Sequence, residues 1–291
     1  MTYEIEFPLN GLDLDAVEAA LFDGGAVSIT LVDHGDDPVL EPKLGEIRLW
    51  SDTLVRALFE DGDELATWAG LASNLGPQIA TTARLRAVAD RDWTRVWLED
   101  WKSMRFGRRL WVCPTAAAAP DDPNAVVVRL DPGLAFGTGT HPTTGLCLQI
   151  LESLPLSGRR VIDYGCGSGI LGIAALKMGA SQVTAVDLDP QALIATRDNA
   201  LLNGVSSAME VQDVPVQLRT ASCVVANILA GPLIELAPLL TEACEVGGDL
   251  LLSGLLTTQA YEVKAAYATG FDRVQVVGRD DWCCIHARRS S

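Results

Sequence analysis

The most constraining feature of this chain is the segment Val161–Ile170, which reads V-I-D-Y-G-C-G-S-G-I. An apolar run ends at Asp163, three glycines alternate with other residues, and a helix-forming stretch follows. The next apolar run, Gln182–Asp187, again ends on an acid. This order predicts a strand, a glycine turn, a helix and a second strand. Glycines let a ligand approach the backbone closely, and an acid after the second strand can accept both hydroxyls of a ribose. The segment therefore predicts a site for an adenosine-containing cofactor.

The spacing of the glycines indicates which cofactor this is. Dinucleotide-binding turns read G-x-G-x-x-G, but here the spacing is G-x-G-x-G and Ile170 stands where the third glycine would be. Asp163, two residues before Gly165, would repel a pyrophosphate and attract a cation. S-adenosylmethionine carries a sulfonium and an ammonium group and no phosphate. The segment therefore favours a methyltransferase over a dehydrogenase, which stays open as an alternative, as does a binding module without catalysis.

Composition limits the partners and the compartment. The chain has 38 acidic and 22 basic residues and a net charge of −16, which argues against a nucleic acid held through its phosphates. Residues 1–60 contain 13 acidic and 3 basic residues, which suits solubility or a basic protein partner. No C-x-x-C pair or histidine cluster predicts a metal site. No signal peptide or membrane-spanning run is recognisable, so we expect a cytosolic protein, and nothing demands more than a monomer.

The first ninety residues predict a small α+β domain. Strands are expected at 3–8, 26–33, 46–50 and 83–89, and helices at 14–22, 53–59 and 64–74. That order resembles a ferredoxin-like β-α-β-β-α-β domain spanning 1–90. Trp93, Trp97 and Trp101 then recur every fourth residue, which places them on one face of a helix. We expect a linker helix region at 91–108.

The remaining residues, 109–291, predict an α/β domain with a doubly wound sheet. A hairpin-like strand pair is expected at 110–113 and 126–130, ahead of a helix at 143–153. Strands are then expected at 160–163, 182–187, 208–212, 223–227, 249–253, 272–278 and 282–288. Helices are expected at 170–178, 190–203, 231–244 and 257–269. The short connection at 278–281 makes the last two strands antiparallel, as in the Rossmann-like sheet of class I methyltransferases.

Two polar residues mark the edge where this sheet would bind ligands. Asp187 is the candidate partner of the ribose hydroxyls, although a solvated acid at a strand end would look the same. Asn227 ends an apolar run in V-V-A-N-I-L-A-G-P, and its carbonyl oxygen can accept an N–H from a target amine. A backbone carbonyl at Ile228 or Leu229 can accept another. Asn227 could instead be a turn residue before Gly231.

The segment Leu130–Pro142 is rich in glycine and threonine and can close over the cofactor. Phe136 is a candidate wall for the methionine end of the cofactor, and Thr144 offers a hydroxyl at the start of the next helix. His141 is a candidate base, although one histidine in a turn is more often structural. Asp213 follows the third strand of the sheet and is a weak candidate for contact with the adenine amino group.

Four segments together resemble one known family, the ribosomal protein L-eleven methyltransferases of the PrmA type. They are D-W-T-R-V-W-L-E-D-W-K-S-M-R-F-G-R-R-L-W-V-C-P, L-D-P-G-L-A-F-G-T-G-T-H-P-T-T, V-I-D-Y-G-C-G-S-G-I-L-G-I-A-A-L-K-M-G-A and V-V-A-N-I-L-A-G-P-L. The glycine segment is common among methyltransferases, whereas the A-F-G-T-G-T-H-P-T-T and N-I-L-A segments are more specific. The chain departs from the family pattern at Thr115, where a tryptophan is usual nearby, and at Cys284, where a basic residue is usual.

The resemblance implies a substrate-recognition domain, a linker helix and a class I catalytic domain. It implies transfer of methyl groups from S-adenosylmethionine to lysine side chains and the N-terminal α-amine of one large-subunit ribosomal protein, up to the trimethyl level. Carried over by motif, cofactor contacts fall on Thr144, Gly165, Asp187 and Asn227, and the residues themselves add Asp163, Gly167 and Gly169. Asn227 and Phe136 are the candidates for the catalytic role. A class I enzyme that methylates another protein or a small amine is the alternative.

Overall fold

The computed structural model describes residues 2–35, 49–60, 70, 75–88, 102–130 and 139–290. The chain divides into two compact units, Met1–Val96 and Trp97–Ser291. Most of the expected linker helix, with its three tryptophans, lies outside the described residues. The boundaries expected for a recognition domain, a linker and a catalytic domain therefore stay predictions. No helix within the described ranges combines the length and the apolar character that a bilayer crossing requires.

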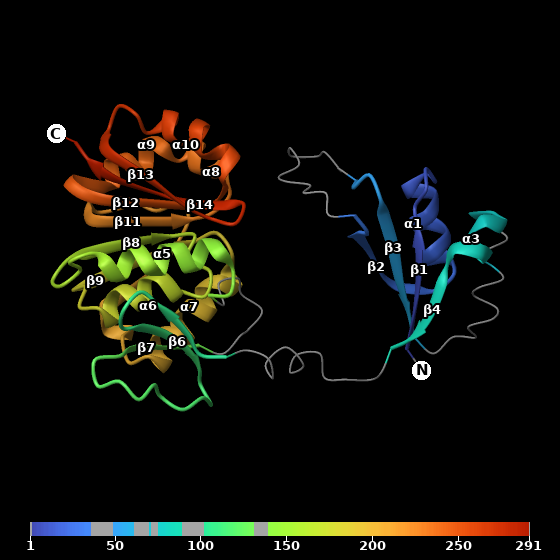
Figure 1. Cartoon of the computed structure of the whole chain (residues 1–291), viewed down its shortest axis with the longest axis horizontal. Helices are drawn as coiled ribbons and strands as arrows, with labels where there is room; N and C mark the ends of the chain where they lie inside the picture. Colours follow the sequence, from blue (N-terminus) through green and yellow to red (C-terminus); the bar gives the residue numbers. More distant parts are fainter. Residues whose placement is uncertain are drawn as a thin grey trace. The chain divides into compact units, whose positions relative to one another are not determined.

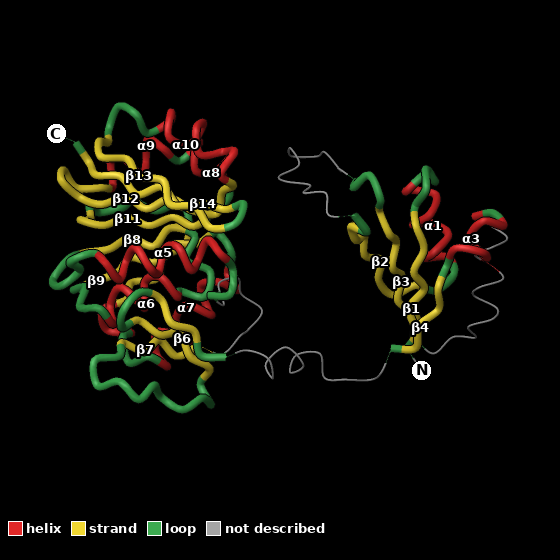
Figure 2. The backbone as a smooth tube through the Cα atoms, in the orientation of Figure 1, coloured by secondary structure: helices red, strands yellow, loops and turns green. Residues whose placement is uncertain are grey.

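The first unit contains one antiparallel sheet with strand order β2-β3-β1-β4 (Figure 2). Its elements are β1 (Tyr3–Pro8), α1 (Leu14–Asp23), β2 (Ala26–Asp33), β3 (Thr53–Phe59), α3 (Pro77–Thr82) and β4 (Arg84–Ala87). Asp13 caps α1 by accepting a hydrogen bond from the Ala16 backbone N–H at 2.9 Å. Val17 and Leu21 of α1 and Ile79 of α3 pack with the inward side chains of the strands into one core.

Most of the strands expected in this unit are confirmed, but one assignment is wrong. Residues Thr53–Phe59 form strand β3 and not a helix. This strand pairs with β1 on one side and with β2 on the other, so both edges of its backbone are hydrogen-bonded and the sheet decides its conformation. The strand expected at 46–50 and the helix expected at 64–74 lie mostly outside the described residues. The ferredoxin-like assignment therefore stays a prediction.

The second unit contains a seven-stranded sheet with order β10-β9-β8-β11-β12-β14-β13 (Figure 1). Five strands are parallel neighbours, and β14 runs antiparallel to both β12 and β13. This confirms the class I methyltransferase sheet with a reversed last strand. The elements of this sheet and its helices are α5 (Pro142–Ser153), β8 (Arg160–Tyr164), α6 (Ile170–Lys177), β9 (Gln182–Asp187), α7 (Pro190–Leu202), β10 (Met209–Asp213), β11 (Ala221–Asn227), α8 (Ala230–Glu235), α9 (Ala237–Ala243), β12 (Cys244–Leu256), α10 (Ala260–Ala266), β13 (Phe271–Arg279) and β14 (Trp282–Arg289).

Two hydrophobic cores sandwich this sheet. One core joins the sheet to α5, α6 and α7, and includes Leu148 and Ile173. The other joins the opposite face to α8, α9 and α10, and includes Leu233 and Val263. The helix groups lie on the two sides of the strands in Figure 1. Because the central strands are covered on both faces, their residues are apolar almost throughout, and polar residues gather at the strand ends.

Two local expectations for this unit are wrong. Strands β6 (Leu110–Pro114) and β7 (Val126–Leu130) pair in parallel and not as a hairpin, and β5 (Met104–Phe106) completes their sheet on the other side of β6. The alanine- and proline-containing connection is long enough to carry the chain back to the same end of the sheet. The helix expected at 231–244 is two helices, because Pro238 near the start of α9 has no N–H to continue the helical hydrogen bonds.

A buried ion network ties the amino-terminal ends of β8 and β12 to β14. Asp249 has no exposed surface, and its carboxylate contacts Arg159 at 2.8 Å, His286 at 2.9 Å and Arg288 at 3.3 Å. Burial alone would raise the pKa of Asp249, but the hydrogen bonds from His286 and Arg159 outweigh it and hold the pKa below its ordinary value. Asp249 therefore stabilises the fold above pH 4, and this contribution is lost as pH falls through the lowered pKa.

We expect Asp249→Asn to lower the free energy of unfolding by about 3 kcal/mol at pH 7, because Arg159 is left mostly buried without its charge partner. Urea denaturation measures this loss. Glu245→Gln is the control, since the Arg160–Glu245 pair is largely exposed and contributes less than about 1 kcal/mol. Equal losses in the two variants, or a loss in Asp249→Asn that stays the same below pH 3, would contradict this assignment.

Candidate cofactor and substrate site

The glycine turn lies at the carboxyl end of β8, beside the end of β9. The backbone N–H groups of Gly165 and Cys166 both donate to the Val186 carbonyl, at 2.7 and 3.0 Å. Gly165, Gly167 and Gly169 all have positive φ values, 73°, 54° and 79°, which other residues rarely adopt. The turn is thus held against the second strand in a conformation that needs all three glycines.

Glycine also permits a close approach between this turn and the N-I-L-A segment. A Cβ atom at Gly165 would lie 2.2 Å from Ile228 Cγ2, and one at Gly254 would lie 2.4 Å from the Ile228 carbonyl oxygen. Ile228 therefore occupies space left by glycines on the two neighbouring strands, β8 and β12. This contact places Asn227, at the end of β11, directly beside the glycine turn.

Asp163 is the buried acid of the turn. Its Oδ2 accepts a hydrogen bond from the Gly172 backbone N–H at 2.8 Å, and its Oδ1 is buried with no partner among the described residues. Burial raises the pKa of Asp163 to about 7, the Gly172 N–H acts in the opposite direction, and the charge of Asp187 adds to the rise. A buried acceptor without a donor is costly, so this oxygen is suited to a cationic or N–H-bearing ligand.

Asp187 and Asp213 lie side by side at the ends of β9 and β10, where they are register partners. Asp187 accepts from the backbone N–H of Gly167 at 2.8 Å and from that of Asp189 at 3.0 Å. These two bonds orient its carboxylate, and each oxygen keeps a further lone pair for a hydroxyl. Asp213 is exposed and accepts from the Val214 N–H at 2.7 Å. The structure thus brings together the two acids that were expected near a nucleoside.

Asn227 faces the first turn of α5. Its Nδ2 donates to Thr144 Oγ1 at 3.3 Å, and its Oδ1 is buried and has no hydrogen-bond partner in the part of the chain that the structure describes. Thr144 is 3% exposed, so this contact is enclosed. The amide is therefore held through its nitrogen while its carbonyl oxygen stays available. An N–H donor from a ligand would satisfy that oxygen.

His141 is a helix cap in this structure. Its Nδ1 lies 2.7 Å from Thr143 Oγ1 and accepts from the Thr143 N–H at 3.3 Å, at the start of α5. Desolvation lowers its pKa, so the ring is neutral at pH 7. Its ring packs edge-to-face on Trp282, with the centroids 4.6 Å apart. Phe136, the other candidate from the Leu130–Pro142 segment, lies outside the described residues.

Two polar residues of α7 support the turn, a third polar residue caps the helix and bonds β7, and all three were missed in the sequence. Thr196, fully buried, donates to the Gly167 carbonyl at 2.9 Å, and Asn199 donates to the Ser168 carbonyl at 2.9 Å. Asn203 exchanges hydrogen bonds with the Arg129 backbone of β7. Their spacing of three and four residues places them on one helix face, and a polar stripe on an inward-facing helix was the available signal.

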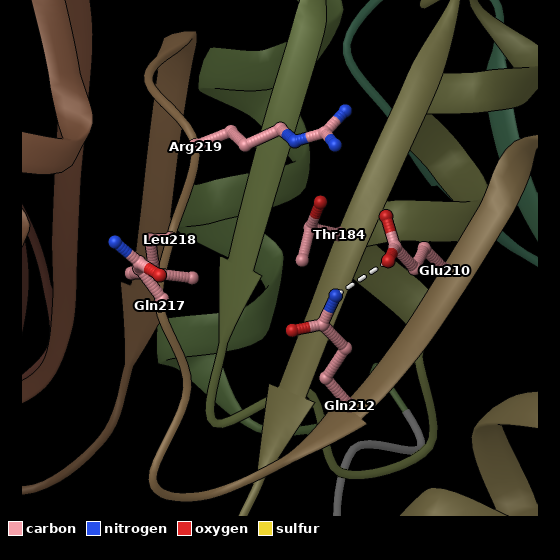
Figure 3. Close-up of a pocket in the computed structure, with 6 residues that line it drawn as sticks. All are labelled: Thr184, Glu210, Gln212, Gln217, Leu218 and Arg219. Atoms are coloured by element: carbon pink, nitrogen blue, oxygen red, sulfur yellow. Dashed lines mark hydrogen bonds between the residues drawn. The ribbon is translucent and has the colours of Figure 1, made fainter.

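A separate recess of about 470 Å³ lies on the other face of the sheet (Figure 3). Thr184 of β9 and Glu210 and Gln212 of β10 line it together with Gln217–Arg219. Thr184 alternates with Val183 and Ala185, which face the core under α6, so its side chain points away from that helix. None of the expected site residues lines this recess, and it is distinct from the site at the strand ends.

These residues fit S-adenosylmethionine better than a dinucleotide. Two carboxylates bind the backbone of this segment, since Asp187 accepts from the Gly167 N–H and Asp163 from the Gly172 N–H. The two buried oxygens without partners, on Asp163 and Asn227, are both acceptors. Acceptors and negative charge favour a ligand with ammonium, hydroxyl and sulfonium groups, and disfavour one with a pyrophosphate.

Gly165→Ala tests the close approach to Ile228. Gly158→Ala is a matched control, because Gly158 has the same φ of 73° but open space around a Cβ atom. We expect Gly158→Ala to lose about 1 kcal/mol of stability from backbone strain, and Gly165→Ala to lose more because Ile228 must also move. In isothermal titration calorimetry, only Gly165→Ala should bind S-adenosylmethionine more weakly, by about tenfold or more, since Ile228 must move. Equal affinities in the two variants would show that the contact does not shape the site.

Asp163→Asn tests the buried acid. Since folding raises the pKa of Asp163 above its unfolded value of about 3.9, this acid costs the wild-type protein stability as pH rises from 4 through 7. We therefore expect the free energy of unfolding of Asp163→Asn, relative to wild type, to rise by about 2 kcal/mol between pH 5 and pH 8, as measured by urea denaturation. This variant should also bind the donor more weakly. Asp198→Asn, which changes an exposed acid of α7 outside the site, is the control. A constant stability difference across this pH range would contradict the buried ionisation.

The comparisons with known proteins agree with this geometry. The family described as "Ribosomal protein L11 methyltransferase (PrmA)" matches residues 2–290. Ribosomal protein L11 methyltransferases of Escherichia fergusonii and of Escherichia coli K12 are each 50% identical, over 98% of this chain and 99% of theirs. A crystal structure of the ribosomal protein L11 methylase of Lactobacillus delbrueckii subsp. bulgaricus has 32% identity and a TM-score of 0.60, covering 66% of this chain and all of that one. The chain therefore belongs to the ribosomal protein L11 methyltransferase family.

Proposed function

We propose that this protein is an S-adenosylmethionine-dependent methyltransferase that modifies ribosomal protein L11 on amino groups, namely lysine side chains and the N-terminal α-amine. Family membership over nearly the whole chain supports the reaction and the protein substrate. The observation that carries the site is the buried Asn227 Oδ1, which no described residue hydrogen-bonds and which lies beside the glycine turn. An acceptor in that place is suited to an amine.

The residues around the turn hold the methyl donor in this proposal. Gly165, Gly167 and Gly169 admit it to the backbone, Asp187 accepts the ribose hydroxyls, and Asp163 faces its positive charge. Thr144 lines the same site through its contact with Asn227. When bound, the donor supplies a methyl group activated by attachment to a positively charged sulfur.

Asn227 orients the target amine. Its Oδ1 accepts one N–H, and the Ile228 carbonyl accepts a second, because the Leu229 carbonyl is already bound by the Leu233 N–H at 3.1 Å. The two acceptors hold the N–H groups of the amine on one side, so its lone pair points to the opposite side, toward the methyl donor. The Thr144 hydroxyl holds the Asn227 amide nitrogen, so the carbonyl oxygen cannot rotate away.

The amine must be neutral to react. A lysine ammonium has a reference pKa of about 10.4, and desolvation together with the nearby positive charge lowers it. The proton passes to water, and no residue is required as a general base. His141 is assigned no proton transfer in this proposal, and its Nδ1 caps α5.

The small first unit is the proposed substrate-recognition domain, at residues 1–90, joined through 91–108 to the catalytic domain at 109–291. Its acidic composition attracts a basic ribosomal protein and raises the association rate. We further propose that the protein works in the cytosol as a monomer, without direct contact to nucleic acid or membrane.

Intact-mass analysis of purified ribosomal protein L11 after incubation with the enzyme and donor tests this function. We expect mass increases in steps of one methyl group with the wild-type enzyme. Asn227→Ala should lower the transfer rate about 100-fold, because the amine loses its orientation, while donor affinity changes much less. Asn124→Ala, which removes an exposed loop amide, is the control.

Two results would contradict the proposal. An unchanged mass of L11, with methyl transfer to another protein or to a small amine in the same assay, would favour a different substrate. A wild-type rate in Asn227→Ala would remove Asn227 from the reaction.

A further inference from the structure

An aromatic pair lies at the same end of the sheet as Asn227, the acceptor proposed for the target amine. The ring of His141 meets the indole of Trp282 edge-to-face, with centroids 4.6 Å apart and planes at 74°. His141 precedes α5 and Trp282 begins β14, so residues far apart in the sequence form this pair. Both side chains keep part of their surface accessible. The reaction as described above uses neither ring.

A closed series of contacts connects this pair to Asn227. On one side, Asn227 donates to Thr144 in the first turn of α5, the turn that His141 caps. On the other side, Asn227 is the register partner of Ser253 on β12, and Ser253 Oγ donates to the Cys283 carbonyl at 2.8 Å. Cys283 is the residue after Trp282. The aromatic pair therefore lies at the same end of the sheet as the Asn227 amide.

The residues that follow Asn227 supply no aromatic surface. They are Ile228, Leu229 and Ala230. An amine that forms a bond to a methyl carbon gains positive charge as the carbon–sulfur bond breaks with its electron pair on sulfur. After the first and second transfers a proton then leaves to water, whereas the third leaves a quaternary ammonium group that keeps its charge. The face of a tryptophan ring attracts such a charge more strongly than any other side-chain ring. A neutral His141 ring, whose pKa is lowered by desolvation, does not repel it.

We propose that Trp282, with its ring oriented by His141, is the surface that recognises the methylated ammonium group in this enzyme and keeps successive methyl additions efficient. This proposal rests on the proposed amine N-methylation. Trp282 contacts the substrate nitrogen and its methyl groups, whereas His141 is a positioning residue. Each added methyl group enlarges the cation and reduces its capacity to donate hydrogen bonds to Asn227, so the contribution of the ring grows from the first transfer to the third.

Replacement of Trp282 by site-specifically incorporated trifluorotryptophan tests this role. The fluorinated ring keeps the shape of the indole but has a weaker negative face, so the fold is preserved. The same replacement at Trp111, a half-buried residue of β6, is the matched control. The full-length proteins are incubated with ribosomal protein L11 and excess donor, and intact-mass spectra are recorded over time.

We expect the variant at position 282 to slow the second and third transfers about fivefold more than the first, so that monomethylated product accumulates. Binding of S-adenosylhomocysteine, measured by calorimetry, should be unchanged, as should the melting temperature. The variant at position 111 should behave like the wild type. Equal slowing of all three transfers, weaker binding of S-adenosylhomocysteine, or wild-type ratios of the methylated products would each overturn the proposal.

A binding measurement separates this proposal from the choice of substrate. Tetramethylammonium and neopentyl alcohol, a neutral molecule of similar shape, are titrated against the protein saturated with S-adenosylhomocysteine. We expect the cation to bind more tightly than the alcohol, and this preference to fall about fivefold in the variant at position 282. If L11 gains no methyl group but the preference persists and requires Trp282, the ammonium site stands and the proposed substrate is wrong. Equal binding of the two probes in the wild type would overturn the ammonium site.

Discussion

The contact of Ile228 with two glycines, Gly165 and Gly254, is the constraint around which the site is built. A side chain at either position would place a Cβ atom within 2.4 Å of Ile228 and would push the N-I-L-A segment away from the glycine turn. Without such side chains, the ends of β8, β11 and β12 come close enough to form one continuous edge. The Asn227 amide then lies beside the turn, and the two halves of the site, for donor and for amine, share a wall.

Buried acceptors without partners give this edge its chemical character. The Asp163 and Asn227 oxygens are both excluded from water and lack a donor within the described residues. Such groups destabilise the ligand-free protein. A ligand that donates hydrogen bonds or carries positive charge relieves part of this destabilisation when it binds, which increases its affinity. Thr196 and Asn199 of α7 hold the turn by its carbonyls, so the backbone is rigid where the ligand is to be bound.

Stability and binding are separated within the sheet. The carboxyl ends of the parallel strands hold the acceptors of the site, whereas the opposite ends hold the Asp249 ion network, in which every charge near the buried carboxylate is paired. The reversed strand β14 joins the two. Its first residue, Trp282, reaches the site edge, and its later residues, His286 and Arg288, reach the ion network. One antiparallel strand therefore connects both ends of the domain.

Much of the catalytic domain follows from local pattern, because parallel strands buried on both faces are apolar runs whose ends are marked by acids, amides and glycines. The strands at 160–164, 182–187 and 221–227, and the positions of Asp163, Asp187 and Asn227 at or near their ends, were predictable for that reason. Long-range pairing was not. Thr53–Phe59 is a strand because two neighbours bind its backbone, and β6 and β7 are parallel because of the path of a long connection. The polar residues of α7 are spaced to share one helix face, but their partners in the turn depend on how the elements pack. The contact of His141 with Trp282 also depends on that packing, which the spacing of residues along the chain does not reveal.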